Sequence, residues 1–98
     1  MILVRNSFQV KFGRMKEAVA LLKENLALAR SAGLQTGRLM TDVTGPFYTL
    51  VLELEYESMA EADKGQAAVG KLSGWQETYQ KFAGVVDSGS REIFSVVA

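Results

Sequence analysis

The sequence predicts an α+β fold in which a four-stranded antiparallel sheet carries helices on one face. Segments with alternating apolar side chains are interleaved with segments of helical periodicity. These elements follow one another in the order strand, helix, strand, strand, helix, strand. A short turn with glycine and the only proline links the two central strands, which favours an antiparallel hairpin.

The first strand is predicted over residues 2–12, because side chains there alternate between two faces of an extended chain. The first helix is predicted over residues 14–33. Its apolar residues recur at spacings of four and three, and its basic residues mark the opposite face. Gly33 suits the C-terminal cap of this helix.

The second strand is predicted over residues 34–43 and the third over residues 47–57, with the turn at 44–46 between them. One face of the third strand carries Tyr48, Leu50, Leu52, Leu54 and Tyr56. The opposite face is mixed, since it carries Phe47, Thr49, Val51, Glu53 and Glu55.

The second helical region begins with a capping box in which Ser58 caps and Glu61 reaches back. A second capping sequence at 73–76 predicts that the helix restarts there at a new angle. We predict a turn at 87–90 and a fourth strand over residues 91–97. Together the elements form a ferredoxin-like βαββαβ plait, in one domain over residues 1–98.

The helices of such a plait cover one sheet face only. The face predicted to lie under them carries Ile2, Val4, Phe8, Leu50, Leu52 and Leu54. The other face mixes apolar residues with charges and suits burial against a second copy. We expect it to carry Leu3, Met40 and Val51 together with Arg5, Arg38, Glu53 and Arg91.

Composition excludes several classes of function. Hydrophobic residues make up 48% of the 98 residues, a high share for one small core, which suggests an oligomer interface. Eleven basic residues balance eleven acidic ones without a basic stripe, so we expect neither nucleic acid nor an anionic membrane as a partner. No apolar run approaches the ~20 residues of a membrane span, and we expect a cytoplasmic protein.

The chain has no cysteine and no histidine. Thiolate chemistry, the usual zinc and iron ligands and a histidine base are therefore excluded, and we expect no metal and no cofactor. A tyrosine-bound haem normally needs a neighbouring second group such as an arginine. We expect Arg5, Arg38 and Arg91 to point away from the helices.

Three stretches resemble the NIPSNAP-like branch of the dimeric α+β barrel superfamily: FQVKFG (8–13), TGPFYTLVLELEYESMAEAD (44–63) and GWQETYQKF (74–82). The resemblance implies a homodimer in which two sheets close face to face into one barrel. It does not fix a reaction, because the superfamily includes small monooxygenases, haem-degrading enzymes, isomerases and members of unknown role.

An aromatic stripe is the first candidate for a ligand site. Trp75, Tyr79 and Phe82 are spaced by four and three, so they share one helix face. They either fill the core or line a cavity between helix and sheet. Core packing is the first interpretation, and the two overlap because core residues also line cavities.

Asn6 is the second candidate, because it interrupts an apolar strand face. It either binds a ligand together with Tyr48 or Tyr56, or is satisfied by an internal hydrogen bond. The predicted ligand-binding residues are Asn6, Tyr48, Trp75 and Tyr79. The predicted dimer-interface residues are Arg5, Arg38, Val51 and Glu53.

Two functions are open. The first is a homodimeric barrel that is non-catalytic or binds a small apolar or aromatic molecule between helices and sheet. The alternative is a cofactor-independent monooxygenase or isomerase acting on a small aromatic substrate, in which tyrosine or asparagine stabilises a developing oxyanion.

Overall fold

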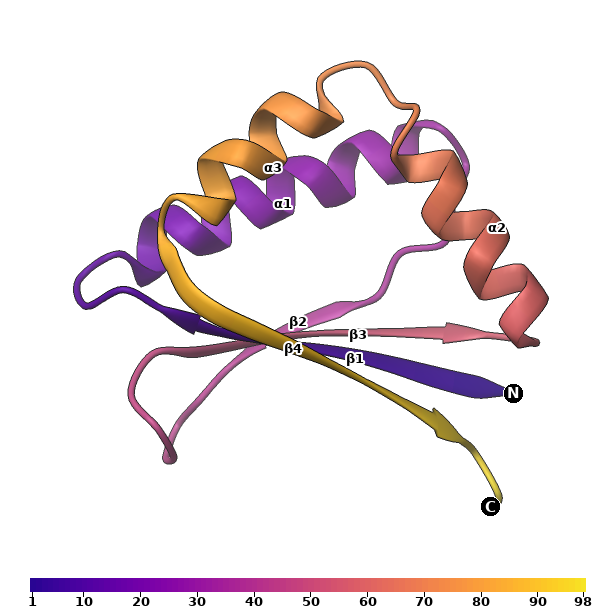
Figure 1. The fold of residues 1–98 in the computed structure, drawn as a ribbon, viewed down its shortest axis with the longest axis horizontal. Coiled ribbons are helices and arrows are strands. Elements are labelled where there is room, and N and C mark those ends of the chain that lie inside the picture. Colours follow the sequence, from indigo (N-terminus) through magenta and orange to yellow (C-terminus); the bar gives the residue numbers. More distant parts are fainter.

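The computed structural model describes all residues, 1–98. Its elements are β1 (Ile2–Val10), α1 (Met15–Ser31), β2 (Arg38–Thr41), β3 (Thr49–Tyr56), α2 (Met59–Val69), α3 (Trp75–Ala83) and β4 (Val86–Ser95). The sheet order is β2-β3-β1-β4 with every neighbouring pair antiparallel. All three helices lie on one side of the sheet (Figure 1). The predicted ferredoxin-like α+β plait is thus confirmed, with its second helical region divided in two.

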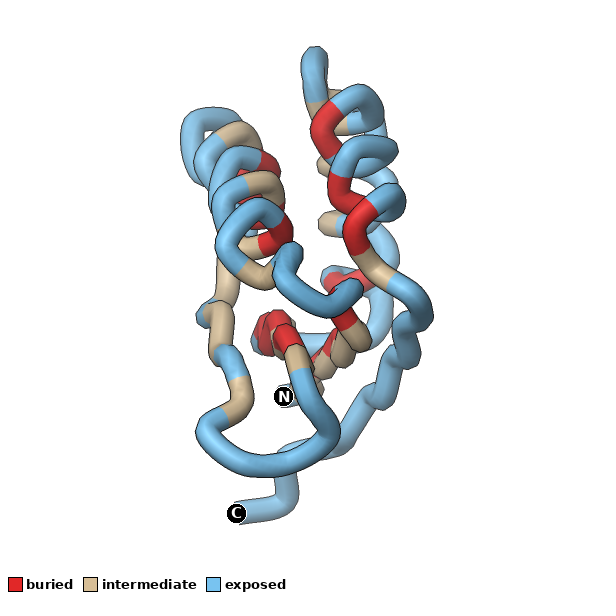
Figure 2. Tube along the Cα trace, turned by 90° about the vertical axis from the view of Figure 1, so that its left-hand side faces the viewer, coloured by how far each residue is buried: buried red, intermediate tan, exposed pale blue.

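The core lies between the helices and the apolar face of β1 and β3. Figure 2 shows the buried segments of the helices and of the sheet turned toward one another. Phe82 of α3 is buried and meets the ring of Phe8 edge to face, with centroids 4.9 Å apart. Burial of apolar surface is the main stabilising contribution in a domain of this size. The core residues are Val10, Ala18, Leu22, Leu26, Leu50, Leu52, Leu54, Phe82 and Val85.

Helix α1 matches its predicted range to within two residues at each end. Gly33 follows it with a φ of 73°, the left-handed conformation expected beyond a helix C-terminus. One buried side chain of α1 is polar. Asn25 is fully buried, and neither of its amide atoms has a hydrogen-bond partner.

The helical region breaks between Val69 and Trp75, as predicted. The first cap is confirmed, because Ser58 Oγ accepts a hydrogen bond from the backbone N–H of Glu61 at 3.3 Å. The second cap is not the predicted Ser73. Gly74 is the N-cap residue of α3, with a φ of 85° that glycine adopts without steric cost.

The turn predicted at 87–90 is wrong, because β4 already begins at Val86. Gly89 pairs with Phe8, and a Cβ at Gly89 would lie 3.1 Å from the Phe8 ring. The small residues therefore leave room for an aromatic ring that crosses the strand, and they do not mark a turn. The register between β1 and β4 shifts at Gln9–Val10.

The β2–β3 hairpin is confirmed, although β2 is shorter than predicted. Arg38 pairs with Glu53, and Thr41 pairs with Leu50. Gly37 precedes β2 in close contact with β3. A Cβ at Gly37 would fall on the carbonyl oxygen of Glu53 and within 2.7 Å of its carbonyl carbon.

Candidate functional site

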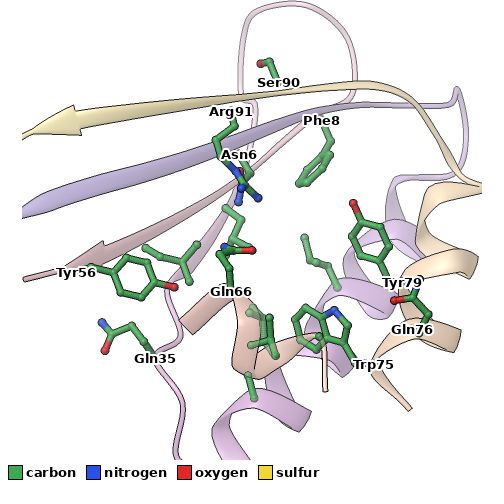
Figure 3. A pocket seen from close by; sticks show the side chains of 17 residues that line it. Asn6, Phe8, Gln35, Tyr56, Gln66, Trp75, Gln76, Tyr79, Ser90 and Arg91 are labelled. Atoms are coloured by element: carbon green, nitrogen blue, oxygen red, sulfur yellow. The ribbon is translucent and has the colours of Figure 1, made fainter. Parts of the chain in front are cut away.

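A cavity of about 490 Å³ lies between the helices and the sheet. Ten of its seventeen lining residues are apolar, so its interior favours an apolar ligand. β1, β3 and β4 form one side, and α1, α2 and α3 form the other (Figure 3). Two of these ten, Tyr56 and Tyr79, also carry hydroxyl groups, and the polar lining residues are Asn6, Gln35, Gln66, Gln76, Ser90 and Arg91.

The break between α2 and α3 accounts for the position of this cavity. Val69 and Gly70 line it from the end of α2, and Trp75 lines it from the start of α3. α3 packs along α1, whereas α2 leans toward the far end of β3 (Figure 1). Space therefore remains where two helices diverge, instead of one straight helix covering the sheet.

Arg91 and Asn6 form the polar end of the cavity. The two residues pair across β1 and β4, and Arg91 Nε donates a hydrogen bond to Asn6 Oδ1 at 2.7 Å. Asn6 is buried, whereas Arg91 is exposed to solvent. Figure 3 shows both side chains on the sheet side, with Trp75 and Tyr79 on the helix side.

The predicted orientation of Arg91 is wrong. Because Arg91 pairs with the buried Asn6, its side chain faces the helices and not the open face with Arg5 and Arg38. The fourth strand has no hairpin partner in sequence, so alternation alone does not fix which of its faces points inward. The pairing of Gly89 with Phe8 sets that register instead.

Tyr56 lines the same cavity from the end of β3. Burial raises its pKa above the ordinary value of 10.0, an effect partly opposed by the positive charge of Arg91. The phenol is therefore neutral at physiological pH and can both donate and accept a hydrogen bond. Gly65 of α2 packs against this ring, since a Cβ there would lie 3.1 Å from Tyr56 Cε1.

Three of the four predicted ligand residues, Asn6, Trp75 and Tyr79, line the cavity together. The fourth, Tyr48, does not line it. Tyr48 stands before β3 with a φ of 62°, and its ring packs on Phe12 at 4.9 Å between centroids. The exposed Phe47 completes this separate aromatic cluster at the other end of the sheet.

The aromatic stripe divides between core and cavity. Phe82 is buried in the core, Trp75 is half-buried, and Tyr79 is 43% exposed. Sequence reasoning missed Arg91 as a cavity residue and named Tyr56 only as an alternative to Tyr48. The signal for Tyr56 was its place on the same strand face as Leu52 and Leu54.

The open sheet face carries the predicted charge cluster. Glu53 is only 5% exposed and accepts hydrogen bonds from Arg5 Nε at 2.7 Å and from Arg38 Nη2 at 2.9 Å. The hydrogen bonds from Arg38 and Arg5 lower the pKa of Glu53 below its ordinary value. The Arg5 guanidinium also lies 5.2 Å from the ring centre of Phe94.

The structure contains no group of three or more carboxylates that could hold a metal ion. None of its helices combines the length and apolar character needed to cross a bilayer.

No protein-family model and no curated protein matches the chain. Solved structures do match it. An uncharacterised NIPSNAP domain protein from Burkholderia xenovorans aligns at a TM-score of 0.88 and 12% identity, over 100% of this chain and 96% of that one. A NIPSNAP family protein from Agrobacterium tumefaciens aligns at 0.85 and 18%, over 98% and 92% of the two chains.

A structure named antibiotic biosynthesis monooxygenase aligns at a TM-score of 0.76 and 16% identity, over 100% of both chains. All three likenesses lie at the level of the backbone, because so few side chains are shared. The chain therefore has the ferredoxin-like α+β fold of NIPSNAP family proteins, the fold implied by its sequence resemblance.

Proposed function

We propose that this protein binds a small apolar or aromatic molecule in the cavity between its helices and its sheet. The observation that carries the proposal is an apolar cavity of about 490 Å³ with an arginine–asparagine pair at one end. Ligand sites in proteins typically occupy 300–1,000 Å³ and combine apolar walls with a few polar groups that fix orientation.

In this proposal Trp75 and Tyr79 contact the body of the ligand from α3. Asn6 belongs to the polar end, where it holds the side chain of Arg91. Tyr56 replaces Tyr48 as the tyrosine that can hydrogen-bond the ligand, because only Tyr56 lines the cavity.

A spectroscopic test follows from the single tryptophan of the chain. Trp75 gives one indole N–H signal in a proton–nitrogen correlation spectrum, and it reports directly on the cavity. We expect small aromatic molecules from a fragment collection to shift this signal in a saturable way. We also expect mass spectrometry of the freshly purified protein to show whether such a molecule is retained.

A filling variant supplies the control for this test. Val69→Phe adds a ring to a lining position and should abolish the shifts, whereas Ala67→Phe adds the same ring on an exposed position of α2 outside the cavity. If ligands still bind Val69→Phe normally, or if no molecule shifts the Trp75 signal, the cavity is not a binding site.

We further propose that the chain, as one domain over residues 1–98, forms a homodimer through the open sheet face. Two observations support this. No helix covers this face, and its apolar residues are incompletely shielded, since Leu3, Met40 and Val51 are only half-buried and Phe94 of β4 is exposed there. Arg5, Arg38, Val51 and Glu53 would lie in this interface. A second copy would complete the burial of Glu53, whose charge is already balanced.

A second candidate function is a cofactor-independent monooxygenase or isomerase. The observation that favours it is the backbone likeness to the structure named antibiotic biosynthesis monooxygenase. Asn6, Tyr79 and Arg91 could stabilise a developing oxyanion, although no carboxylate lines the cavity to serve as a base. Loss of turnover in Tyr79→Phe or Asn6→Ala, with ligand binding retained, would favour this enzyme.

A further inference from the structure

We infer that the ligand of this cavity carries a negative charge, bound by Arg91, on an apolar or aromatic body. The inference rests on the proposed binding function and adds the chemical class of the ligand: an organic anion such as an aromatic carboxylate. Three independent features of the cavity support it.

The first feature is the state of the Arg91 side chain. Its Nε is already hydrogen-bonded to Asn6 Oδ1, which fixes the orientation of the planar guanidinium. Arg91 makes no ion pair with any carboxylate of the chain, although four ion pairs form elsewhere. Its terminal nitrogens are therefore available to a ligand, and a guanidinium matches the two oxygens of a carboxylate.

The second feature is the charge inventory of the cavity. Arg91 is the only lining residue that is ionised at neutral pH, since Tyr56 remains a neutral phenol and no aspartate or glutamate lines the walls. Glu92, the next residue, is the cross-strand neighbour of Arg5 in the β1–β4 register, so its side chain points to the opposite face of the sheet. The cavity consequently carries one uncompensated positive charge, which disfavours cations and favours a monoanion.

The third feature is the placement of the aromatic side chains. Trp75 and Tyr79 line the cavity from α3, whereas Phe8, Asn6 and Arg91 line it from the sheet side (Figure 3). A ligand that spans these two parts has an apolar ring at one end and its charge at the other. Arg91 is exposed, so a charged group bound to it keeps part of its hydration.

The experiment compares two probes of equal shape, 2-naphthylacetate and its neutral amide, 2-naphthylacetamide. Affinity is measured by calorimetry, and the Trp75 indole signal identifies the cavity as the site. We expect the anion to bind about tenfold to a hundredfold more tightly than the amide. This is the gain in affinity that one hydrogen bond between charged groups contributes. The difference should shrink as salt is added, because Arg91 is exposed.

Two variants and one control assign the preference to Arg91. Arg91→Gln should bind both probes equally, and Asn6→Asp should do the same by giving Arg91 an internal counter-ion without changing the size of the side chain. Arg30→Gln removes the same charge from an exposed position of α1 outside the cavity and should keep the preference.

The outcomes separate this inference from the proposed function. Equal affinity of the two probes for the unmodified protein, or a preference that survives in both variants, overturns the anion assignment and leaves a neutral-ligand cavity. If neither probe shifts the Trp75 signal while neutral fragments do, the anion assignment alone fails. If no molecule shifts the signal, the binding function fails and the anion assignment fails with it. The variant spectra are first checked for native dispersion, and Asn6→Asp carries the test if Arg91→Gln does not fold.

Discussion

Arg91 donates a hydrogen bond from Nε to the side-chain oxygen of Asn6 at 2.7 Å, across the antiparallel pair of β1 and β4. This contact explains why an amide interrupts the apolar face of β1. The buried oxygen has a charged donor, and the donor in return is held in one orientation. The two interpretations of Asn6, internal satisfaction and ligand binding, are therefore compatible.

The aromatic residues of α3 should differ in their contributions to stability. Phe82→Ala removes a buried ring from the core and should lower the free energy of unfolding by about 3–5 kcal/mol. Trp75→Ala should cost less, about 1–2 kcal/mol, because Trp75 is half-buried beside a cavity. Urea unfolding measures both, and an equal loss would show that Trp75 belongs to the core.

Asn25→Leu should stabilise the protein. Leucine has the same number and branching of heavy atoms as asparagine, and it removes two buried polar atoms that have no partner. We expect a gain of about 1–3 kcal/mol in the free energy of unfolding, the usual cost of such an unsatisfied group. Urea unfolding measures the change. A lower urea midpoint for Asn25→Leu would mean that the amide of Asn25 is hydrogen-bonded in solution.

Gly37→Ala should destabilise the β2–β3 hairpin. Its Cβ would overlap the backbone carbonyl of Glu53, and a backbone atom cannot rotate away as a side chain does. We expect a loss of about 1–3 kcal/mol or more. Gly70→Ala is the matched control, because its Cβ would meet nothing closer than 3.7 Å. Thermal unfolding measures both variants. Equal melting temperatures would contradict the close approach of Gly37 to β3.

Glu53 should make stability fall in acid. Its pKa is lowered in the folded protein by hydrogen bonds from Arg38 and Arg5, from an ordinary value of 4.5. The stabilisation is therefore complete above about pH 4.5 and is lost as the pH falls through the lower, folded pKa. Glu53→Gln should weaken this dependence, whereas Glu57→Gln, at an exposed position, should keep it. Urea midpoints at pH 7 and pH 3 provide the measurement.

The protein should be a homodimer at micromolar concentration. No helix covers the open face of the sheet (Figure 1), where Leu3, Met40 and Val51 are only half-buried, and a second copy is the simplest cover for it. Light scattering coupled to gel filtration gives the molar mass directly. Val51→Lys, at the centre of that face, should yield a folded monomer. If the unmodified protein is itself a monomer, the proposed dimeric barrel is wrong.

The sequence predicted the fold well because its apolar patterns are regular. Alternation in β1 and β3 and the spacing in α1 specify one buried face each, and the cap at Ser58 marks a helix start through local chemistry alone. These features depend on neighbours in the chain, so they can be predicted from the sequence alone.

The fourth strand could not be predicted in full from such local patterns. The glycine and serines at 88–90 have the composition of a turn, yet they belong to β4 and pair with β1, where Gly89 leaves space for the Phe8 ring. The orientation of Arg91 follows from that long-range pairing, and with it the charge of the cavity. Tyr48 was misplaced for a related reason, since its positive φ takes it out of the strand's alternation.

The divergence of α2 and α3 makes the size of the cavity adjustable without disturbing the sheet. Residues 70–74 connect the two helices on the outside of the molecule, where insertions are tolerated better than within a strand. Lengthening or shortening this connection would change the distance between the cavity walls and leave every strand register intact. The volume of the cavity could thus evolve, or be engineered, independently of folding.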